Sequence, residues 1–134
     1  MVAVSETEKI TINLGPVDLG QIDLLVEQGL YSNRTDLIRT AIRNQLERHS
    51  SVIEDVSVRQ SYSLGVLIYD RKDLEKRRAE GKKLSIHIVG MLTLTPSITP
   101  ELALETIESI WIRGKLIAPK AVREALGDRI DTGK

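Results

Sequence analysis

The sequence predicts an α+β chain in two parts: a strand–helix–helix unit, then a β-rich unit that contains a strand repeat. Between residues 9 and 14 polar and apolar residues alternate, and two amphipathic segments follow before residue 50. After residue 58 the pattern Ser-Ile-x-Ile-x-Gly-x-Leu occurs twice, at an offset of 24 residues. We expect a disordered start at 1–7, a first domain at 8–49, a connector at 50–58 and a second domain at 59–134.

Composition limits the class of protein. A chain of 134 residues forms one or two small domains, and with no Phe and one Trp its core must be aliphatic. No apolar run approaches the roughly 20 residues that cross a bilayer, and the first residues lack the features of a signal peptide. The absence of cysteine excludes disulfides and thiolate catalysis. We therefore expect a cytoplasmic protein without a membrane partner.

The alternating segment predicts a strand that needs a second copy of the chain. Successive strand residues point to opposite faces, which places Ile10, Ile12 and Leu14 on one face and Lys9, Thr11 and Asn13 on the other. A single strand leaves its backbone hydrogen-bonding groups without partners. No similar strand lies within hairpin reach, so we expect the same strand of another copy to complete an intertwined dimer.

Two helices are predicted after this strand. Pro16 suits a first helical position and Gly29 a left-handed C-terminal stop. Ser32 or Asn33 can cap the second helix, and Asp36 is placed to reach back to the cap. The two apolar stripes consist of Leu19, Ile22, Leu25 and Val26, and of Leu37, Ile38, Ala41, Ile42 and Leu46.

This strand, turn and capped helix resemble the ribbon–helix–helix family of DNA-binding regulators, over residues 8–49. Within the family the Tyr31-Ser32-Asn33-Arg34-Thr35-Asp36 run is similar to the start of the second helix in nickel-responsive regulators. The resemblance implies a homodimer that places a two-stranded antiparallel ribbon in the major groove of double-stranded DNA. It implies base contacts by Lys9, Thr11 and Asn13, and phosphate contacts by the backbone amides and hydroxyls around Ser32, Asn33, Arg34 and Thr35.

The chemistry of these residues fits such an interface. Lys can donate to guanine, Asn can pair with adenine, and Thr offers a hydroxyl and a methyl group. A helix N-terminus supplies free N–H groups and a positive dipole to a phosphate. The net charge of the chain is zero, and residues 1–50 carry five basic against seven acidic side chains. Non-specific DNA binding should therefore be weak.

The second part alternates strands with short helices. Residues 61–69 are β-rich, Asp70 caps a charged segment that stops at Gly81, and Thr99 and Pro100 open another helix. The charged segment is interpreted as a solvated helix with internal ion pairs rather than a second phosphate-binding patch. A last short helix spans residues 119–126.

The repeat predicts stacked strands. Its Ile, Ile, Gly and Leu residues should point inward, and the glycine should leave room for a neighbouring backbone. Because two or three such units are few for independent stability, we expect residues 59–134 to self-associate into a higher oligomer. Gly114→Val should then disrupt assembly and spare the N-terminal fold.

No catalytic, metal or cofactor site is predicted. His49 and His87 are the only histidines, and no nucleophile or phosphate-loop motif is present. Trp111 is interpreted as a packed side chain rather than an exposed contact residue.

The sequence thus favours a non-enzymatic, sequence-specific DNA-binding transcriptional regulator, a repressor. One alternative is the antitoxin of a toxin–antitoxin pair, whose C-terminal half would bind the toxin as a protein partner. Another is a plasmid-partition or relaxosome accessory protein that binds DNA repeats. Antitoxins of this family usually have disordered tails, whereas the second part of this sequence is expected to fold. We therefore rank the antitoxin second.

Overall fold

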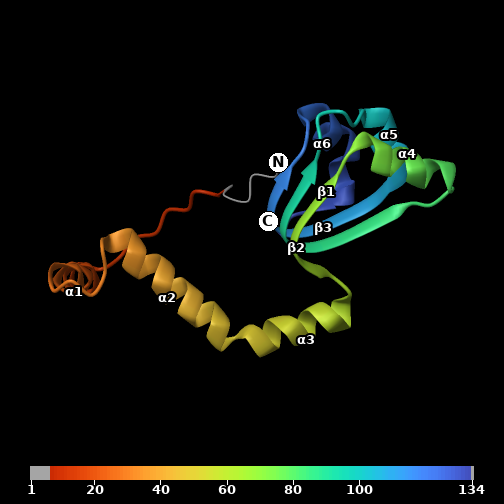
Figure 1. The fold of residues 1–134 in the computed structure, drawn as a ribbon. Helices are drawn as coiled ribbons and strands as arrows, with labels where there is room; N and C mark the ends of the chain where they lie inside the picture. The colour runs from red at the N-terminus through yellow and green to blue at the C-terminus, as the bar shows by residue number, and fades with distance from the viewer. Residues whose placement is uncertain (1–6, 134) are drawn as a thin grey trace. The chain divides into compact units, whose positions relative to one another are not determined.

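The computed structural model describes residues 7–133 and divides the chain into two compact units, Met1–Asp55 and Val56–Lys134. Of the segment 1–7, for which disorder was expected, only Thr7 lies within the described residues. Each unit is considered by itself below, and Figure 1 labels the elements of both. Within residues 7–133 no helix is both long and apolar enough to cross a bilayer.

Unit 1 contains the two predicted helices, α1 (Pro16–Glu27) and α2 (Arg34–Arg48). Pro16 occupies the start of α1, and Gly29 follows it with a φ of +82°, a left-handed conformation that glycine adopts without strain. Asn33 is the N-cap of α2, and its side chain accepts a hydrogen bond from the Asp36 amide. Local chemistry therefore sets both ends of the α1–α2 connection, as predicted.

The segment of residues 8–14 is not a hydrogen-bonded strand in the single chain. It runs as an extended trace into α1 (Figure 1), and its residues are exposed. The physical reason is that a strand is defined by a ladder, and unit 1 offers this segment no neighbouring strand. Its antiparallel pairing with a second copy remains a prediction.

Residues 50–58, which were predicted to be a connector, are helical. They form most of α3 (Ser50–Gln60), which begins after α2 ends at His49. The Ile53 amide donates to the His49 carbonyl, which starts the new helix at the break. Ile53 and Val56 are half-buried and nearly one helical turn apart.

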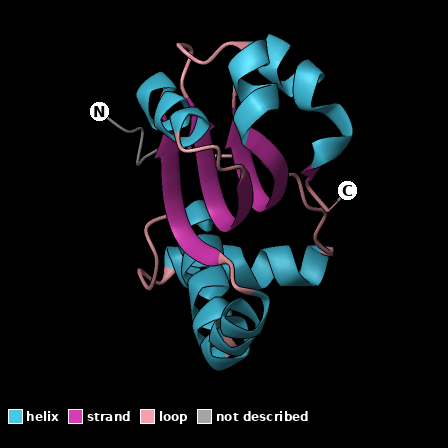
Figure 2. Cartoon of the chain, turned by 90° about the vertical axis from the view of Figure 1, so that its right-hand side faces the viewer, coloured by secondary structure: helices cyan, strands magenta, loops and turns pink. Residues whose placement is uncertain are grey.

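Unit 2 is a parallel sheet whose strands alternate with helices. Its elements are β1 (Ser63–Tyr69), α4 (Arg71–Ala79), β2 (Leu84–Leu94), α5 (Pro100–Thr106), β3 (Ile107–Ile117), α6 (Lys120–Leu126), a 3₁₀ turn (Gly127–Arg129) and β4 (Ile130–Asp131). The sheet order is β1-β2-β3-β4, and every neighbouring pair is parallel. Figure 2 shows the strands as one sheet beside the helices. A parallel pair needs a crossover, usually a helix, so unit 2 is more helical than a β-rich domain.

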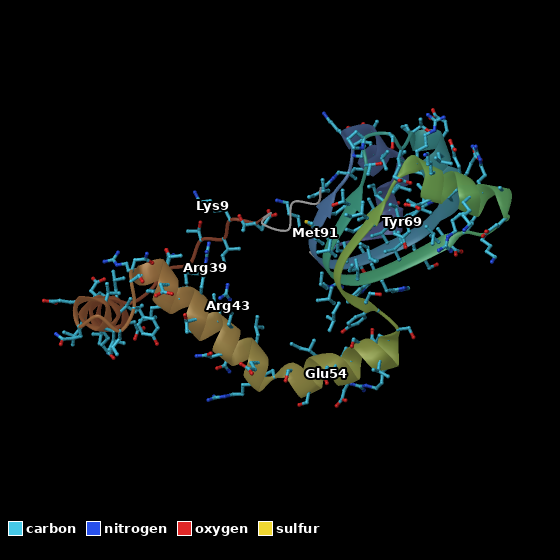
Figure 3. All side chains as sticks on the ribbon, viewed as in Figure 1. Lys9, Arg39, Arg43, Glu54, Tyr69 and Met91 are labelled. Atoms are coloured by element: carbon cyan, nitrogen blue, oxygen red, sulfur yellow. The ribbon has the colours of Figure 1, made fainter. Side chains whose placement is uncertain are left out.

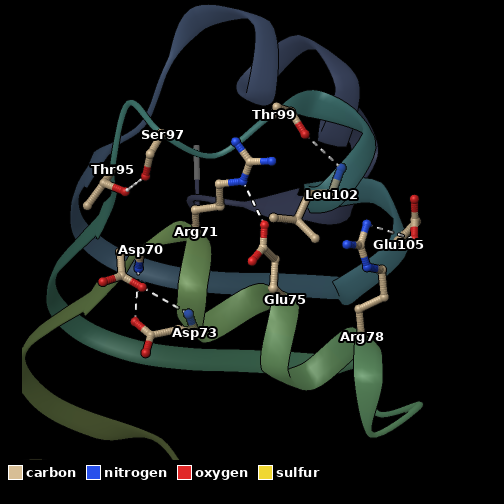
Figure 4. A network of polar contacts seen from close by, with 10 residues as sticks. All are labelled: Asp70, Arg71, Asp73, Glu75, Arg78, Thr95, Ser97, Thr99, Leu102 and Glu105. Atoms are coloured by element: carbon tan, nitrogen blue, oxygen red, sulfur yellow. Dashed lines mark hydrogen bonds and ion pairs between the residues drawn. The ribbon is translucent and has the colours of Figure 1, made fainter.

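The helices of unit 2 begin at the caps that the sequence indicates. Asp70 and Asp73 form a reciprocal capping box at the start of α4, and the Thr99 hydroxyl accepts from the Leu102 amide at the start of α5 (Figure 4). Ion pairs join Arg71 to Glu75 and Arg78 to a glutamate of α5. The charged helix α4 is thus paired at several points, as a solvated surface helix should be.

The two copies of the repeat are neighbouring strands paired in register. Ser85 lies opposite Ser109, Gly90 opposite Gly114 and Leu92 opposite Leu116. These paired residues are therefore 24 positions apart in the chain, the same offset that separates the two copies of the repeat. Gly65 on β1 lies opposite Gly90. Glycines therefore occupy one rung across three strands. All three have φ between +125° and +137°, and a Cβ on Gly90 or Gly114 would overlap the carbonyl oxygen of the glycine before it.

The described hydrophobic core lies entirely in unit 2. Its buried side chains come from α4, both long strands, α5 and α6, and include Leu74, Ile88, Leu92, Ile112 and Val122. The inward face of the repeat is thus covered by helices of the same chain. The expectation that this face is left uncovered is therefore wrong, whereas the higher oligomer inferred from it remains a prediction.

Candidate nucleic-acid interface

The start of α2 holds a compact set of polar contacts. Asn33 Oδ1 accepts from the Asp36 amide at 2.8 Å, and Asp36 Oδ2 accepts from the Ser32 amide at 2.9 Å. These two bonds fix the turn that precedes the helix. The amides of Arg34 and Thr35 occupy the first helical positions, where no intrahelical acceptor exists. These amides could therefore donate to an acceptor outside the helix.

Arg34 is committed to an ion pair within unit 1. Its Nε donates to Asp23 Oδ1 at 2.7 Å, and its Nη2 donates to Asp23 Oδ2 at 2.8 Å. These hydrogen bonds lower the pKa of the Asp23 carboxyl below its ordinary value, and they raise the pKa of the Arg34 guanidinium. The Arg34 side chain therefore ties α2 to α1, and a phosphate would compete with Asp23 for it.

Two further arginines lie along α2 beside this turn. A shallow hollow of about 380 Å³ is lined by Ser32, Asn33, Thr35, Asp36, Arg39, Thr40 and Arg43. Figure 3 shows Arg39 and Arg43 projecting from the side of α2 that is nearer to the extended segment. The two guanidiniums give the hollow a local excess of positive charge although unit 1 as a whole is slightly acidic.

Two apolar side chains of the extended segment, Ile10 and Ile12, border a hollow beside α2. This second hollow, of about 610 Å³, is lined by Thr7, Glu8, Lys9, Ile10, Ile12, Thr35, Ile38, Arg39 and Ile42. Thr11 and Asn13 are not among its lining residues, and both are exposed. The lining of this hollow agrees with the predicted alternation at these four positions, but the two-faced strand itself remains a prediction. Lys9 departs from the alternation, because it borders the same hollow as Ile10 and Ile12.

The predicted phosphate residues come together only in part. Ser32, Asn33 and Thr35 line one hollow, whereas Arg34 is held by Asp23. Lys9, Thr11 and Asn13 are all exposed on the extended segment. Arg39 and Arg43 also line the hollow at the capped turn, and they were not among the DNA-binding residues predicted from sequence. The available signal was the spacing of Thr35, Arg39 and Arg43 at four-residue intervals, which places them on one helical face.

A comparison with protein families matches residues 5–123 to the Ribbon-Helix-Helix transcriptional regulator family, and the match covers most of both units. The chain belongs to this family. Neither the comparison with curated proteins nor that with solved structures found a match. Membership of the ribbon–helix–helix family implies DNA binding and dimerisation.

The apolar surface of unit 1 is consistent with a ribbon–helix–helix dimer. None of the described residues of α1 and α2 is fully buried. Large apolar side chains are exposed along the extended segment and α2, including Ile10 at 73%, Ile12 at 57% and Leu46 at 56%. A contiguous apolar surface of this kind marks an interaction site.

Proposed function

We propose that this ribbon–helix–helix protein is a dimeric, sequence-specific repressor that reads the major groove with a two-stranded ribbon. The segments of residues 9–14 from two copies pair antiparallel and present Thr11 and Asn13 to base edges. The observation that carries the proposal is the division of this segment in unit 1. All four side chains are exposed in the single chain, but Ile10 and Ile12 line the hollow beside α2 and Thr11 and Asn13 do not. A two-stranded ribbon of this width fits the major groove.

The capped turn of α2 supplies the phosphate contact in this proposal. A phosphate oxygen accepts from the Arg34 and Thr35 amides, and the Thr35 hydroxyl, Arg39 and Arg43 surround it. Ser32 and Asn33 act through their hydrogen bonds to Asp36, which hold the turn in place. Lys9 is assigned an electrostatic contact at the border of the ribbon, since it lies beside the same hollow as Arg39.

The packed core of unit 2 supports a regulator over an antitoxin. Fifteen buried residues form one cluster in this unit, so its fold does not depend on a toxin that it would wrap. Residues 71–79 also form a charged helix with one internal ion pair, between Arg71 and Glu75, and not an extended charged tail. A partition or relaxosome accessory role shares the same DNA contacts and differs in its DNA target.

Base reading is tested with Thr11→Ala and Asn13→Ala in the full chain. Each substitution removes one polar group from the ribbon face and should lower affinity for the operator by about 1–3 kcal/mol. Binding to random DNA of equal length, at the same salt concentration, should hardly change. Asn44→Ala is the matched control, because Asn44 is exposed on α2 and lines neither hollow. Unchanged operator affinity in both ribbon variants would refute base reading by this face.

A further inference from the structure

The outer face of β1 carries three exposed apolar side chains. Leu64, Val66 and Ile68 are 51%, 47% and 39% exposed. Their neighbours Leu67 and Tyr69 pack against the core on the opposite face. Strand alternation therefore places the exposed three together, away from the helices. An apolar edge strand that is left uncovered is a site where another strand can add.

The opposite edge of the sheet is closed by arginine side chains. Arg113 Nη1 donates to the Ile112 carbonyl at 2.9 Å and to the Asp131 carbonyl at 3.3 Å. Arg123 donates to the Leu116 carbonyl, and Arg129 Nη1 donates to the Ile107 carbonyl at 2.9 Å. The short strand β4 pairs with Ile110 and Trp111 between these positions. An incoming strand would have to displace these bonds, so addition at β3 is disfavoured.

We propose that the β1 edges of two copies of this chain pair antiparallel about Val66 and join the two sheets. A two-fold axis at Val66 places Leu64 opposite the partner's Ile68, which makes a continuous apolar row of six side chains. No residue of Ser63–Tyr69 is charged, so the pairing brings no like charges together. Gly65 has no heavy atom within 4 Å of the position a Cβ would take, which leaves space beside this strand.

Charge around the strand favours the antiparallel direction. A hollow of about 400 Å³ at the C-terminal end of β1 is lined by Ile68, Tyr69, Asp73, Lys76, Arg77, Glu80 and Lys82, three of them basic and two acidic. Parallel pairing of two β1 strands would place two such clusters, each with a small net positive charge, side by side. Antiparallel pairing separates them by the length of the strand, about 20 Å.

The contact is small, and its strength comes from the tether of unit 1. Three side chains per copy are far fewer than the 20–30 residues a side of a standard interface. Two copies already joined through the proposed ribbon experience each other at a high effective concentration, so a weak edge contact still forms. The inference thus uses the ribbon dimer of the proposed function only as a tether. It predicts a second point of contact between copies that the ribbon does not supply.

Cysteine substitution in the full chain tests the pairing, since the protein has no natural cysteine. Residues directly opposite in an antiparallel pair have Cα atoms about 4.5–5.5 Å apart, which is within disulfide range. Val66→Cys should form a cross-linked dimer under mild oxidation. Leu64→Cys should not, because two Leu64 positions lie about 13 Å apart across the axis. Leu64→Cys combined with Ile68→Cys should cross-link again.

Leu104→Cys is the control for random collision, because Leu104 is exposed to a similar degree and lies on α5. The expected result is a cross-linked fraction several-fold higher for Val66→Cys than for Leu104→Cys. Equal fractions in these two variants, or in Leu64→Cys and Val66→Cys, would overturn the pairing. Sedimentation of the reduced chains separates the two proposals. A dimer that does not cross-link at Val66 contradicts only the β1 contact, whereas a monomer contradicts the ribbon dimer as well.

Discussion

Arg34 and Asp23 form a two-point ion pair that joins α2 to α1, with N–O distances of 2.7 and 2.8 Å. Both side chains are about half exposed, so the pair is screened by water and salt. The pair contributes mainly to the arrangement of the helices, because two parallel hydrogen bonds restrain the orientation of α1 and α2 as well as their separation. It also keeps Arg34 beside a carboxylate at the edge of the proposed phosphate site.

This pair makes the stability of unit 1 depend on pH in one direction. Because Arg34 lowers the Asp23 pKa below its ordinary value of 3.8, the stabilisation is present above that value and is lost as pH falls through the lowered pKa. Asp23→Asn should reduce the melting temperature near pH 7 and make no difference in stronger acid. Thermal melts of both proteins across this range, followed by helical circular dichroism, measure the effect. A constant difference at every pH would contradict it.

Arg39 should contribute to DNA affinity without contributing to sequence preference. Arg39→Ala removes one positive charge from the hollow at the start of α2. Affinity should fall about equally for operator and random DNA, and the slope of log affinity against log salt should decrease by about 1. Arg48→Ala, at the other end of α2 and outside the hollow, serves as the control and should change both quantities less.

Unit 1 should gain its stability from dimerisation. Ile10, Ile12 and Leu14 are expected to pack against Ile38, Ile42 and Leu46 of both copies, so melting of α1 and α2 should shift upward with protein concentration. The experiment is best done in a Val66→Asp background, which removes the proposed β1 contact. Trp111 stacks on Tyr62 at a centroid distance of 4.9 Å, and its fluorescence reports unit 2 separately. A concentration-independent transition of a monomer would exclude the intertwined dimer.

The glycine rung should be a requirement of folding rather than of assembly. Gly90→Ala places a Cβ on the carbonyl of Gly65, and Gly114→Val places one on the carbonyl of Gly90. Each should destabilise unit 2 by about 4 kcal/mol or more, the size of effect that marks a severe core or backbone conflict. The expectation that Gly114→Val would affect only assembly is therefore replaced.

Gly65→Ala distinguishes two causes of destabilisation, steric overlap of the new Cβ with a neighbouring carbonyl and strain of the backbone at positive φ. Gly65 has the same positive φ as the other two glycines but open space around it, so its substitution carries strain alone, of order 1–3 kcal/mol. Denaturant unfolding monitored by Trp111 fluorescence compares the three variants. Equal losses at Gly65 and Gly90 would show that overlap with the neighbouring carbonyl has no part in the effect.

Features set by neighbouring residues could be predicted from sequence. The Asn33 cap, the Pro16 start and the Gly29 stop depend on local chemistry, and all three are present. The pairing of β2 with β3 follows the repeat, because two copies of one strand present matching rungs. Helix α3 was not predicted, because its two adjacent serines and its β-branched residues favour a loop or a strand. In the structure these residues form a new helix directly after the break at His49.

Features set by packing could not be predicted. The Asp23–Arg34 pair joins residues 11 positions apart on two helices, and nothing in the spacing alone selects Asp23 over Asp18. The grouping of Arg39 and Arg43 with the capped turn is different, because their four-residue spacing from Thr35 was visible in the sequence. Helices α4, α5 and α6 bury the inward face of the repeat. The strand pattern in the sequence does not show where these helices pack, so this burial could not be predicted from it.

The glycine rung has a consequence for how this chain can change length. Gly65, Gly90 and Gly114 are separated by one strand–helix unit each, and every unit returns the backbone to the same rung. Duplication of one unit within the gene would add a strand whose glycine already fits against the carbonyl before it. Insertion of one residue within a strand would shift its glycine off the rung and turn its side chains to the wrong face. We therefore expect related sheets to gain or lose whole strand–helix units. The edge of the sheet that the arginines close should be retained in each of them.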